Sequence, residues 1–273
     1  VGGTSVCQSD DTFTSEKRVI LLNKIIPAAL KLIRESLQVE RLTSNLVVPA
    51  GACSGYTIPS SHTTSGVANA DFVLYVSAAP TSGSTVAWAG YCHKDGNGRP
   101  ITGRMNFSPK HIAWGADNQK VVMTLVHEVL HAMGFSGSYI ASSSFGSGGA
   151  GAATATKTQR GKTVEEVVTA NVVAQAKAFF GCSTLTGAEI EDEGGSGTGG
   201  SHWERRNQKL DVMAGITGDD QRMSTLTLAL LEDSGHYFVD YSKADAMAWG
   251  KDAGCPFIES KCDSVASGVG TYW

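Results

Sequence analysis

The pentapeptide His-Glu-Val-Leu-His at residues 127–131 constrains the fold of this chain more than any other stretch. The residues around it predict an amphipathic helix from about residue 117, with apolar side chains at helical spacing: Val122, Leu125, Val126, Val129 and Met133. Residues four apart on a helix lie on one face, about 5–6 Å apart at Cβ, so two imidazoles can converge on one metal ion. The pattern therefore predicts that His127 and His131 bind zinc and that Glu128 acts as the general base on a zinc-bound water.

The third zinc ligand must come from another part of the chain. Catalytic zinc usually takes three protein ligands and keeps its fourth position for water. Gly137 stands where the commonest spacing would place a histidine, but His202 lies in a glycine-rich stretch. Met213 follows His202 eleven positions later, which suits a methionine turn beneath a zinc site. The alternative third ligand is Glu165 or Glu166, from the helix expected after the motif, as in gluzincin peptidases.

Several further segments have an apolar periodicity, or glycine and proline residues, that predict secondary structure or its ends. A first helix is expected over residues 14–37, and Gly134 is expected to end the motif helix. Thr163 and Glu166 form a capping-box pattern, which predicts the start of another helix. The remaining expectations are strands over 46–58, 70–77 and 105–107, glycine- and serine-rich stretches over 136–151 and 194–201, and a last helix over 224–233. This order predicts an α+β fold.

Charge and cysteine usage restrict the class of protein further. The net charge of −4 gives no electrostatic reason to expect nucleic acid or an anionic membrane as partner. No run approaches 18 consecutive apolar residues, so no membrane-spanning segment is expected. Six widely spaced cysteines favour disulfides and therefore export. The amino terminus lacks signal-peptide features, so the leader and pro-segment of an exported protein are expected to be absent from this chain.

The order of motifs resembles the leishmanolysin family of metzincin zinc metalloproteases. The stretches that carry the resemblance span nearly the whole chain: Glu16-Lys17-Arg18, Asp71-Phe72-Val73, His-Glu-x-x-His-Ala-x-Gly-Phe-Ser at 127–136, Gly-Ser-His-Trp at 200–203, Met213-Ala214, Trp249-Gly250 and Gly254-Cys255. The resemblance implies a metzincin-type zincin, with a twisted sheet and the active-site helix above the cleft and a mostly helical and irregular lower subdomain. It also implies that His127, His131 and His202 hold the zinc.

The same resemblance implies how the chain is divided and cross-linked. Residues 1–135 would form an N-terminal subdomain with the sheet and active-site helix. Residues 136–201 would be an inserted segment, and residues 202–273 would carry the third ligand and the methionine turn. Disulfides Cys53–Cys92 and Cys182–Cys255 are implied, which leaves Cys7–Cys262 by elimination.

The sequence thus predicts a zinc-dependent endopeptidase of the secreted or cell-surface class, acting on proteins or peptides. Glu128 would accept a proton from the attacking water and pass it to the leaving amine. Met213 and Gly134 would support the site without binding the metal. A catalytically silent adhesion or binding module on the same scaffold is the alternative from another class, and the intact Glu128 argues against it.

Overall fold

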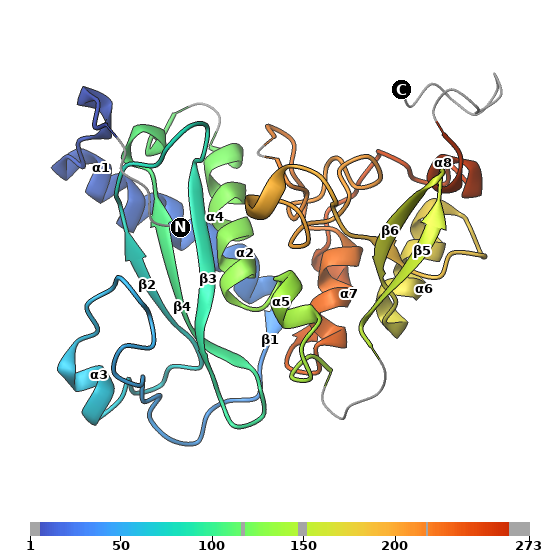
Figure 1. The fold of residues 1–273 in the computed structure, drawn as a ribbon. Helices are drawn as coiled ribbons and strands as arrows, with labels where there is room; N and C mark the ends of the chain where they lie inside the picture. The colour runs from blue at the N-terminus through green and yellow to red at the C-terminus, as the bar shows by residue number, and fades with distance from the viewer. Residues whose placement is uncertain (1–5, 116–117, 147–151, 217, 262–273) are drawn as a thin grey trace. The chain divides into compact units, whose positions relative to one another are not determined.

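The computed structural model describes residues 6–115, 118–146, 152–216 and 218–261 (Figure 1). The chain divides into two compact units, residues 1–134 and 135–273. Each unit contains helices and one three-stranded sheet. The predicted α+β class is therefore confirmed. The division into three subdomains stays a prediction. Among the described residues, no helix is long and apolar enough to span a membrane.

The first unit opens with helices, continues into a sheet and ends with the helix that carries the pentapeptide. Its elements are η1 Ser9–Asp11, α1 Ser15–Ile20, η2 Leu21–Ile25, α2 Ile26–Ser36, β1 Leu37–Gln38, α3 Ser60–Thr64, β2 Val73–Ser77, β3 Ala87–Lys94, β4 Pro100–Phe107, η3 Pro109–His111 and α4 Gln119–Ala132. In α4 the start predicted near residue 117 lies outside the described residues. The predicted end at Gly134 agrees with the last helical residue to within two positions.

The predicted helix over residues 14–37 is confirmed as three consecutive helical segments, α1, η2 and α2. Thr14 caps its start, because the Thr14 hydroxyl accepts the backbone N–H of Lys17 at 3.2 Å. The middle segment, η2, is a π-helical turn. Pro27 follows it and has no N–H to give to the preceding turn, which accounts for the altered hydrogen bonding there.

The sheet of the first unit has the order β2-β4-β3, with β4 parallel to β2 and antiparallel to β3. Helix α4 packs on β3 and β4, and α2 packs on α4. The disulfide Cys53–Cys92 joins the loop before α3 to β3, as the resemblance implied. The helix that carries the pentapeptide is thus held against a sheet on one side and another helix on the other.

The predicted strand over residues 46–58 is wrong. The structure has only one isolated bridge there, between Leu46 and Val67, followed by turns. Leu46 and Val48 are buried in a small apolar cluster, which explains their strand-like composition. Pro49 and Gly51 interrupt the segment, because proline lacks a donor and Gly51 has a positive φ of 74°. In contrast, the predicted strand over 70–77 corresponds to β2, and the one over 105–107 is the end of the longer β4.

The second unit combines a small sheet with two main helices and long connecting segments. Its elements are α5 Gly137–Ile140, β5 Thr154–Gln159, β6 Lys162–Val167, α6 Ala170–Phe180, β7 Ala188–Glu189, η4 Gly195–Gly197, α7 Thr225–Asp233, β8 Phe238–Val239, η5 Tyr241–Lys243 and α8 Cys255–Glu259. The sheet order is β5-β6-β7, antiparallel throughout. The disulfide Cys182–Cys255 joins the chain just after α6 to α8, as implied. Cys7 is exposed and bonded to no described cysteine, and Cys262 lies outside the described residues.

The predicted helix start at Thr163 is wrong, because residues 154–167 form the β5–β6 hairpin. Thr163 and Val164 are β-branched residues, which fit a strand better than a helix. Glu166, assigned above to a capping box, instead pairs across the hairpin with Lys157, at 2.6 Å between Nζ and Oε1. The helix begins later, at Ala170, and ends at Gly181 with a left-handed φ of 66°.

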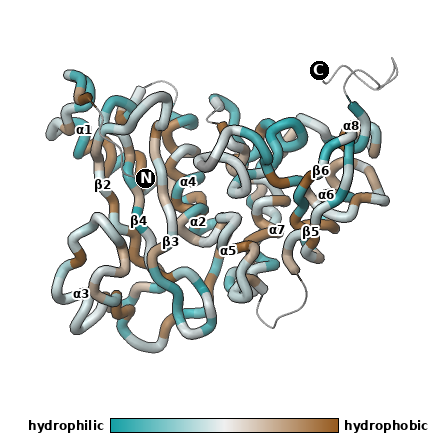
Figure 2. The backbone as a smooth tube through the Cα atoms, viewed as in Figure 1, coloured by the Kyte–Doolittle hydropathy of each residue, from teal (hydrophilic) through white to brown (hydrophobic). Residues whose placement is uncertain are grey.

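The last predicted helix, 224–233, is confirmed as α7. The Ser224 hydroxyl caps it by accepting the backbone N–H groups of Leu226 and Thr227, at 3.1 and 3.2 Å. The helix is hydrophobic along most of its length (Figure 2), and its residues 226–231 are all buried. A helix that is apolar on every face belongs inside its unit, so α7 forms the core against which residues 198–216 and 218–224 are built.

Candidate metal centre

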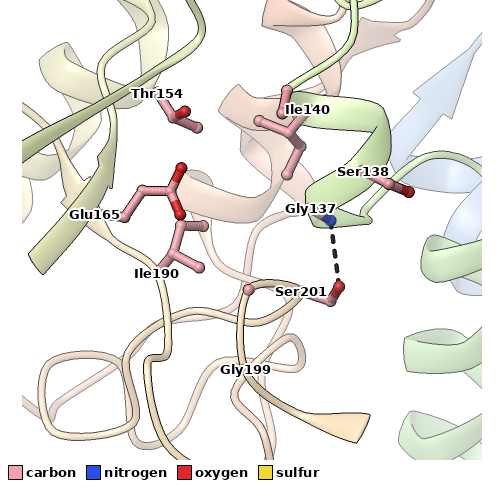
Figure 3. Close-up of a pocket in the computed structure, with 10 residues that line it drawn as sticks. Gly137, Ser138, Ile140, Thr154, Glu165, Ile190, Gly199 and Ser201 are labelled. Carbon is pink, nitrogen blue, oxygen red and sulfur yellow. Dashed lines mark hydrogen bonds between the residues drawn. The ribbon is translucent and has the colours of Figure 1, made fainter. Parts of the chain in front are cut away.

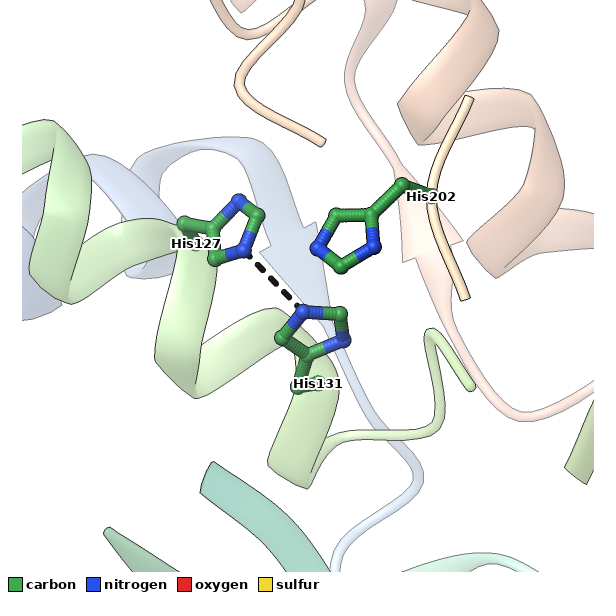
Figure 4. Close-up of side chains that lie close together, drawn as sticks. All are labelled: His127, His131 and His202. Carbon is green, nitrogen blue, oxygen red and sulfur yellow. Dashed lines mark hydrogen bonds between the residues drawn. The ribbon is translucent and has the colours of Figure 1, made fainter. Parts of the chain in front are cut away.

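Helix α4 brings two imidazoles of the pentapeptide together. His127 and His131 are one turn apart, and their Nε2 atoms lie 3.0 Å from each other (Figure 4). The rings are perpendicular, with centroids 4.5 Å apart. Two Nε2 atoms aimed at one point are what a shared metal ion requires, since neutral imidazole nitrogen is a common zinc ligand.

Glu128 lies next to this pair and is deeply buried, with 6% of its surface exposed. Its Oε2 has no hydrogen-bond partner among the described residues. Burial raises the pKa of Glu128 to about 8, because desolvation disfavours the charged carboxylate. A buried carboxyl oxygen without a partner is costly in a folded protein, and such groups are found where chemistry needs them. The two imidazoles and this carboxyl fit a catalytic zinc site.

The chain leaves α4 through a sharp turn at Gly134. The N–H of Met133 still donates to the Val129 carbonyl at 2.9 Å, and the N–H of Gly134 donates to the His131 carbonyl at 3.2 Å. Gly134 itself has φ of 119°, a conformation that residues with a Cβ rarely adopt. The glycine thus lies two residues past the end of the helix, where the chain turns away.

In the second unit, His202 is buried, with 5% of its surface exposed. Its Nδ1 lies 2.7 Å from the carbonyl oxygen of Thr198. A carbonyl only accepts, so Nδ1 carries the proton and the lone pair of the neutral ring is on Nε2. Burial lowers the pKa of His202, and the Thr198 carbonyl opposes this shift. Both features favour the neutral tautomer that binds a metal through Nε2.

Met213 is fully buried, and its backbone is held from two directions. The Met213 N–H donates to Asp211 Oδ1 at 2.6 Å, and the Met213 carbonyl accepts the N–H of Trp203 at 2.9 Å. The segment that contains Met213 therefore runs beside the residue that follows His202. Within the second unit, residues 211–213 thus form a turn that carries the apolar Met213 side chain. A backbone hydrogen bond to Trp203 joins this turn to the segment that contains His202.

His127 and His131 of the first unit and His202 of the second each offer one ring nitrogen that could serve as a metal ligand. Three imidazoles that leave one coordination position for water would match the ligand number of catalytic zinc sites. Neither Glu165 nor Glu166 belongs to any group of candidate metal ligands among the described residues. Both lie on β6 rather than on a helix, and Glu166 is engaged by Lys157 and by the Thr186 hydroxyl, the latter at 2.9 Å.

A group of three carboxylates also lies in the second unit. Glu191, Asp192 and Glu204 have oxygens close enough for one ion. Lys162 already neutralises Asp192, with Nζ 2.8 Å from its carboxylate. The Glu191 carboxylate accepts the backbone N–H groups of residues 193 and 205, which makes it a loop-ordering group. These contacts give the group a structural role.

A cavity of about 320 Å³ lies in the second unit, beside the segment that leads into His202 (Figure 3). Among the described residues that line it, Glu165 is the one ionisable side chain, and the rest are small, hydroxylated or aliphatic: Gly137, Ser138, Ile140, Ala141, Thr154, Ile190, Gly199, Gly200 and Ser201. The Gly137 N–H donates to the Ser201 hydroxyl at 3.2 Å across this cavity's edge. Glu165 thus faces a cavity that is lined in part by residues 199–201, just before His202.

Sequence reasoning did not identify the residues that hold His202 and Met213 in place. These are Thr198, Asp211, Gly215, Ser224 and Thr227. Among these contacts, only the hydrogen bond from Met213 to Asp211 has a local sequence signal, the order Asp-Val-Met at 211–213. An Asp side chain often accepts the backbone N–H two residues later. The other contacts join residues far apart in sequence, so no local pattern indicates them.

The chain is similar over its length to one family of proteins. Residues 1–269 match the peptidase family described as leishmanolysin. A leishmanolysin homolog of Crithidia fasciculata is 39% identical over 260 residues, which cover 94% of this chain and 38% of that protein. Leishmanolysin of Leishmania chagasi is 37% identical over 267 residues, covering 96% and 43%. A leishmanolysin-like peptidase of Drosophila pseudoobscura pseudoobscura is 37% identical over 237 residues, covering 72% and 34%. The chain spans about two-fifths of the length of the first two relatives.

Proposed function

Because the chain belongs to the leishmanolysin family, we propose that it is the catalytic part of a zinc-dependent endopeptidase. The observation that carries the proposal is the pair of Nε2 atoms on α4, 3.0 Å apart, with the buried carboxyl of Glu128 next to it. The helix supplies two ligands and a base within five residues, which is the arrangement that metal-assisted peptide hydrolysis needs.

In this proposal His127, His131 and His202 bind the zinc through Nε2. For His202, the Thr198 carbonyl supports that assignment, because it holds the proton on Nδ1. Zinc bound there would supply Lewis-acid polarisation of the scissile carbonyl and lower the pKa of water to about 7. Met213, fully buried and hydrogen-bonded to the His202 segment through Trp203, would form an apolar support beneath the ligands.

Glu128 moves the protons. The positive charge of a bound zinc ion would favour the ionised carboxylate against the effect of burial. The Oε2 atom of Glu128, which has no partner among the described residues, would then accept a proton from the attacking water and return it to the leaving amine. The burial of this carboxyl keeps bulk water away from it, so the proton is delivered to the substrate and not lost to solvent. Gly134 would let the chain turn away below His131, leaving the helix end open to an extended polypeptide.

Two alternatives make different demands on the same residues. A gluzincin-type site would need Glu165 or Glu166 on a helix that faces the metal, whereas both lie on β6. A silent binding module would have no use for a buried, unpartnered carboxyl at Glu128, which costs stability. The local geometry of α4 therefore favours an enzyme over a binding scaffold.

We also propose a secreted or cell-surface location and protein or peptide substrates. The disulfides Cys53–Cys92 and Cys182–Cys255 suit an oxidising compartment. The peptidase family and the name of the Drosophila pseudoobscura pseudoobscura relative, a leishmanolysin-like peptidase, support polypeptides as substrates.

The proposal is tested by hydrolysis of an unfolded protein, measured together with the zinc content of the enzyme. Hydrolysis should stop when a chelator removes the metal and return when stoichiometric Zn²⁺ is added. Glu128→Gln is the matched control, because it should keep the zinc and lose the hydrolysis. Hydrolysis that persists in the chelator excludes the zinc mechanism. Zinc binding without hydrolysis in the parent protein favours the silent module.

A further inference from the structure

The segment that carries His202 is organised around one buried side chain that no part of the proposed chemistry uses, Asp211. It has no exposed surface. Among the described residues, its carboxylate accepts three hydrogen bonds, all from donors in the second unit. Asp211 Oδ1 accepts the Met213 N–H at 2.6 Å and the Thr227 hydroxyl at 2.8 Å, and Oδ2 accepts the Ser224 hydroxyl.

These contacts connect the carboxylate to the His202 segment by two short routes. The first is the methionine turn, because the Met213 carbonyl in turn accepts the N–H of Trp203 at 2.9 Å. The second is Thr227, whose hydroxyl donates to Asp211 and accepts the indole N–H of Trp203 at 2.9 Å. Trp203 directly follows His202 and is fully buried. Both its backbone and its ring are therefore fixed through contacts that end at Asp211.

The methionine turn also reaches the His202 ring directly. A Cβ added to Gly215 would lie 3.6 Å from His202 Cγ and closer than 3.0 Å to Thr198 Cγ2. The turn backbone is thus packed against the ring and against the residue whose carbonyl holds Nδ1. A displacement of residues 211–215 would move His202 and its hydrogen-bond acceptor together.

We propose that Asp211 is a positioning residue for the metal centre, which holds the methionine turn and Trp203 so that His202 presents Nε2 to the metal. The inference rests on the proposed function and deepens it. Asp211 touches neither substrate nor metal. It acts through Met213, Thr227 and Trp203, as outer residues commonly orient metal ligands.

The charge state of Asp211 fits this role. Burial raises its pKa to about 6, and the hydrogen bonds from Ser224, Met213 and Thr227 oppose that rise. At pH 7.5 the carboxylate is ionised and accepts from all three donors, which makes these charge-assisted bonds. A neutral amide of the same shape would put N–H groups opposite the Ser224 hydroxyl, which already accepts two backbone N–H groups.

Asp211 could also serve only to stabilise the fold, by holding the Ser224 hydroxyl that caps α7. The test must separate this structural role from the positioning of His202. Thr227 allows this, because valine keeps its shape without a hydroxyl and serine keeps the hydroxyl with less volume. Thr227→Val removes the link between Asp211 and the Trp203 ring, and Thr227→Ser restores it. Val172→Ala is the matched control, because Val172 is buried on α6 and has no hydrogen bond to residues 198–215.

The readout is the affinity of the purified protein for Zn²⁺, measured by chelator competition at a temperature well below each variant's Tm. Asp211→Asn and Thr227→Val should bind Zn²⁺ about 10- to 100-fold more weakly than the parent. Thr227→Ser and Val172→Ala should stay within about threefold of it, although both lower Tm.

Affinities of Asp211→Asn and Thr227→Val within threefold of the parent would overturn the proposal. So would a loss in Val172→Ala that matches theirs, because affinity would then follow stability alone. A Thr227→Ser variant as weak as Thr227→Val would overturn the relay through the hydroxyl. If Asp211→Asn fails to fold, the Thr227 pair decides. Failure of the proposed function has a separate signature: the parent protein itself would bind no stoichiometric Zn²⁺ or would hydrolyse protein in the presence of a chelator.

Discussion

Gly215→Ala is a one-carbon change that tests how His202 is held. The new Cβ would lie closer than 3.0 Å to Thr198 Cγ2, a separation that real Cβ atoms essentially never show. The next nearest atoms, Cγ and Cβ of His202, would be 3.6 and 3.7 Å away, which is ordinary van der Waals contact. The clash is therefore with one methyl group, and Thr198 must move to relieve it.

The size of the effect follows from what Thr198 does. Its carbonyl accepts the Nδ1 proton of His202 at 2.7 Å, so a shift of Thr198 turns or releases the imidazole. Overpacking of this kind typically costs about 1–3 kcal/mol of unfolding free energy. Loss of the partner that orients a metal ligand costs about 10- to 100-fold in metal affinity. We expect Gly215→Ala to show both losses.

The assay is Zn²⁺ affinity by chelator competition, with Tm of the metal-free protein measured in parallel. The double variant Gly215→Ala, Thr198→Ala removes the clashing methyl and keeps the carbonyl, so it should recover affinity to within about threefold of the parent. Thr198→Ala alone is the control for the loss of the side chain. Unchanged affinity in Gly215→Ala, or no recovery in the double variant, would refute the link from the turn through Thr198 to His202.

Three other outcomes follow from the site and the cross-links. Glu128→Ala should keep its zinc and lose at least about 100-fold in turnover, since general acid–base help is worth about 10²- to 10⁴-fold; turnover within tenfold of the parent would contradict its role. His202→Ala should lose tight Zn²⁺ binding while Glu166→Gln keeps it, as measured by metal content after dialysis; the reverse result would favour the gluzincin site. A Cys182→Ser, Cys255→Ser variant should lose about 2–5 kcal/mol of unfolding free energy in chemical denaturation, because the disulfide closes a long loop.

Local periodicity predicted the parts of the site that one helix contains. The apolar spacing around His127 and His131 is that of an amphipathic helix, and α4 forms there. The start of α7 was equally readable, because Ser224 followed by an apolar run is a capping signal that needs no distant partner. In both cases the interactions that decide the structure lie within one or two turns.

The hairpin of β5 and β6 shows where such reasoning fails. Thr163 and Glu166 have the spacing of a capping box, and valines recur near helical positions after them. The same residues alternate well enough to form a strand, and pairing with β5 decides between the two. The ion pair between Lys157 and Glu166 belongs to that pairing. Local propensity is a weak guide when a partner strand supplies hydrogen bonds and an opposite charge.

Asp211 could not be found from sequence for a different reason. An acidic residue in a polar stretch is most often exposed, so its identity alone predicts a solvated side chain. Its partners Ser224 and Thr227 lie 13 and 16 positions later, on a helix that must form before they can meet the carboxylate. Burying an ionised group is costly unless several donors surround it, and here three do. A chain that maintains such a group beside its histidine segment is expected to need it for more than stability, because apolar residues could fill the same space at lower cost.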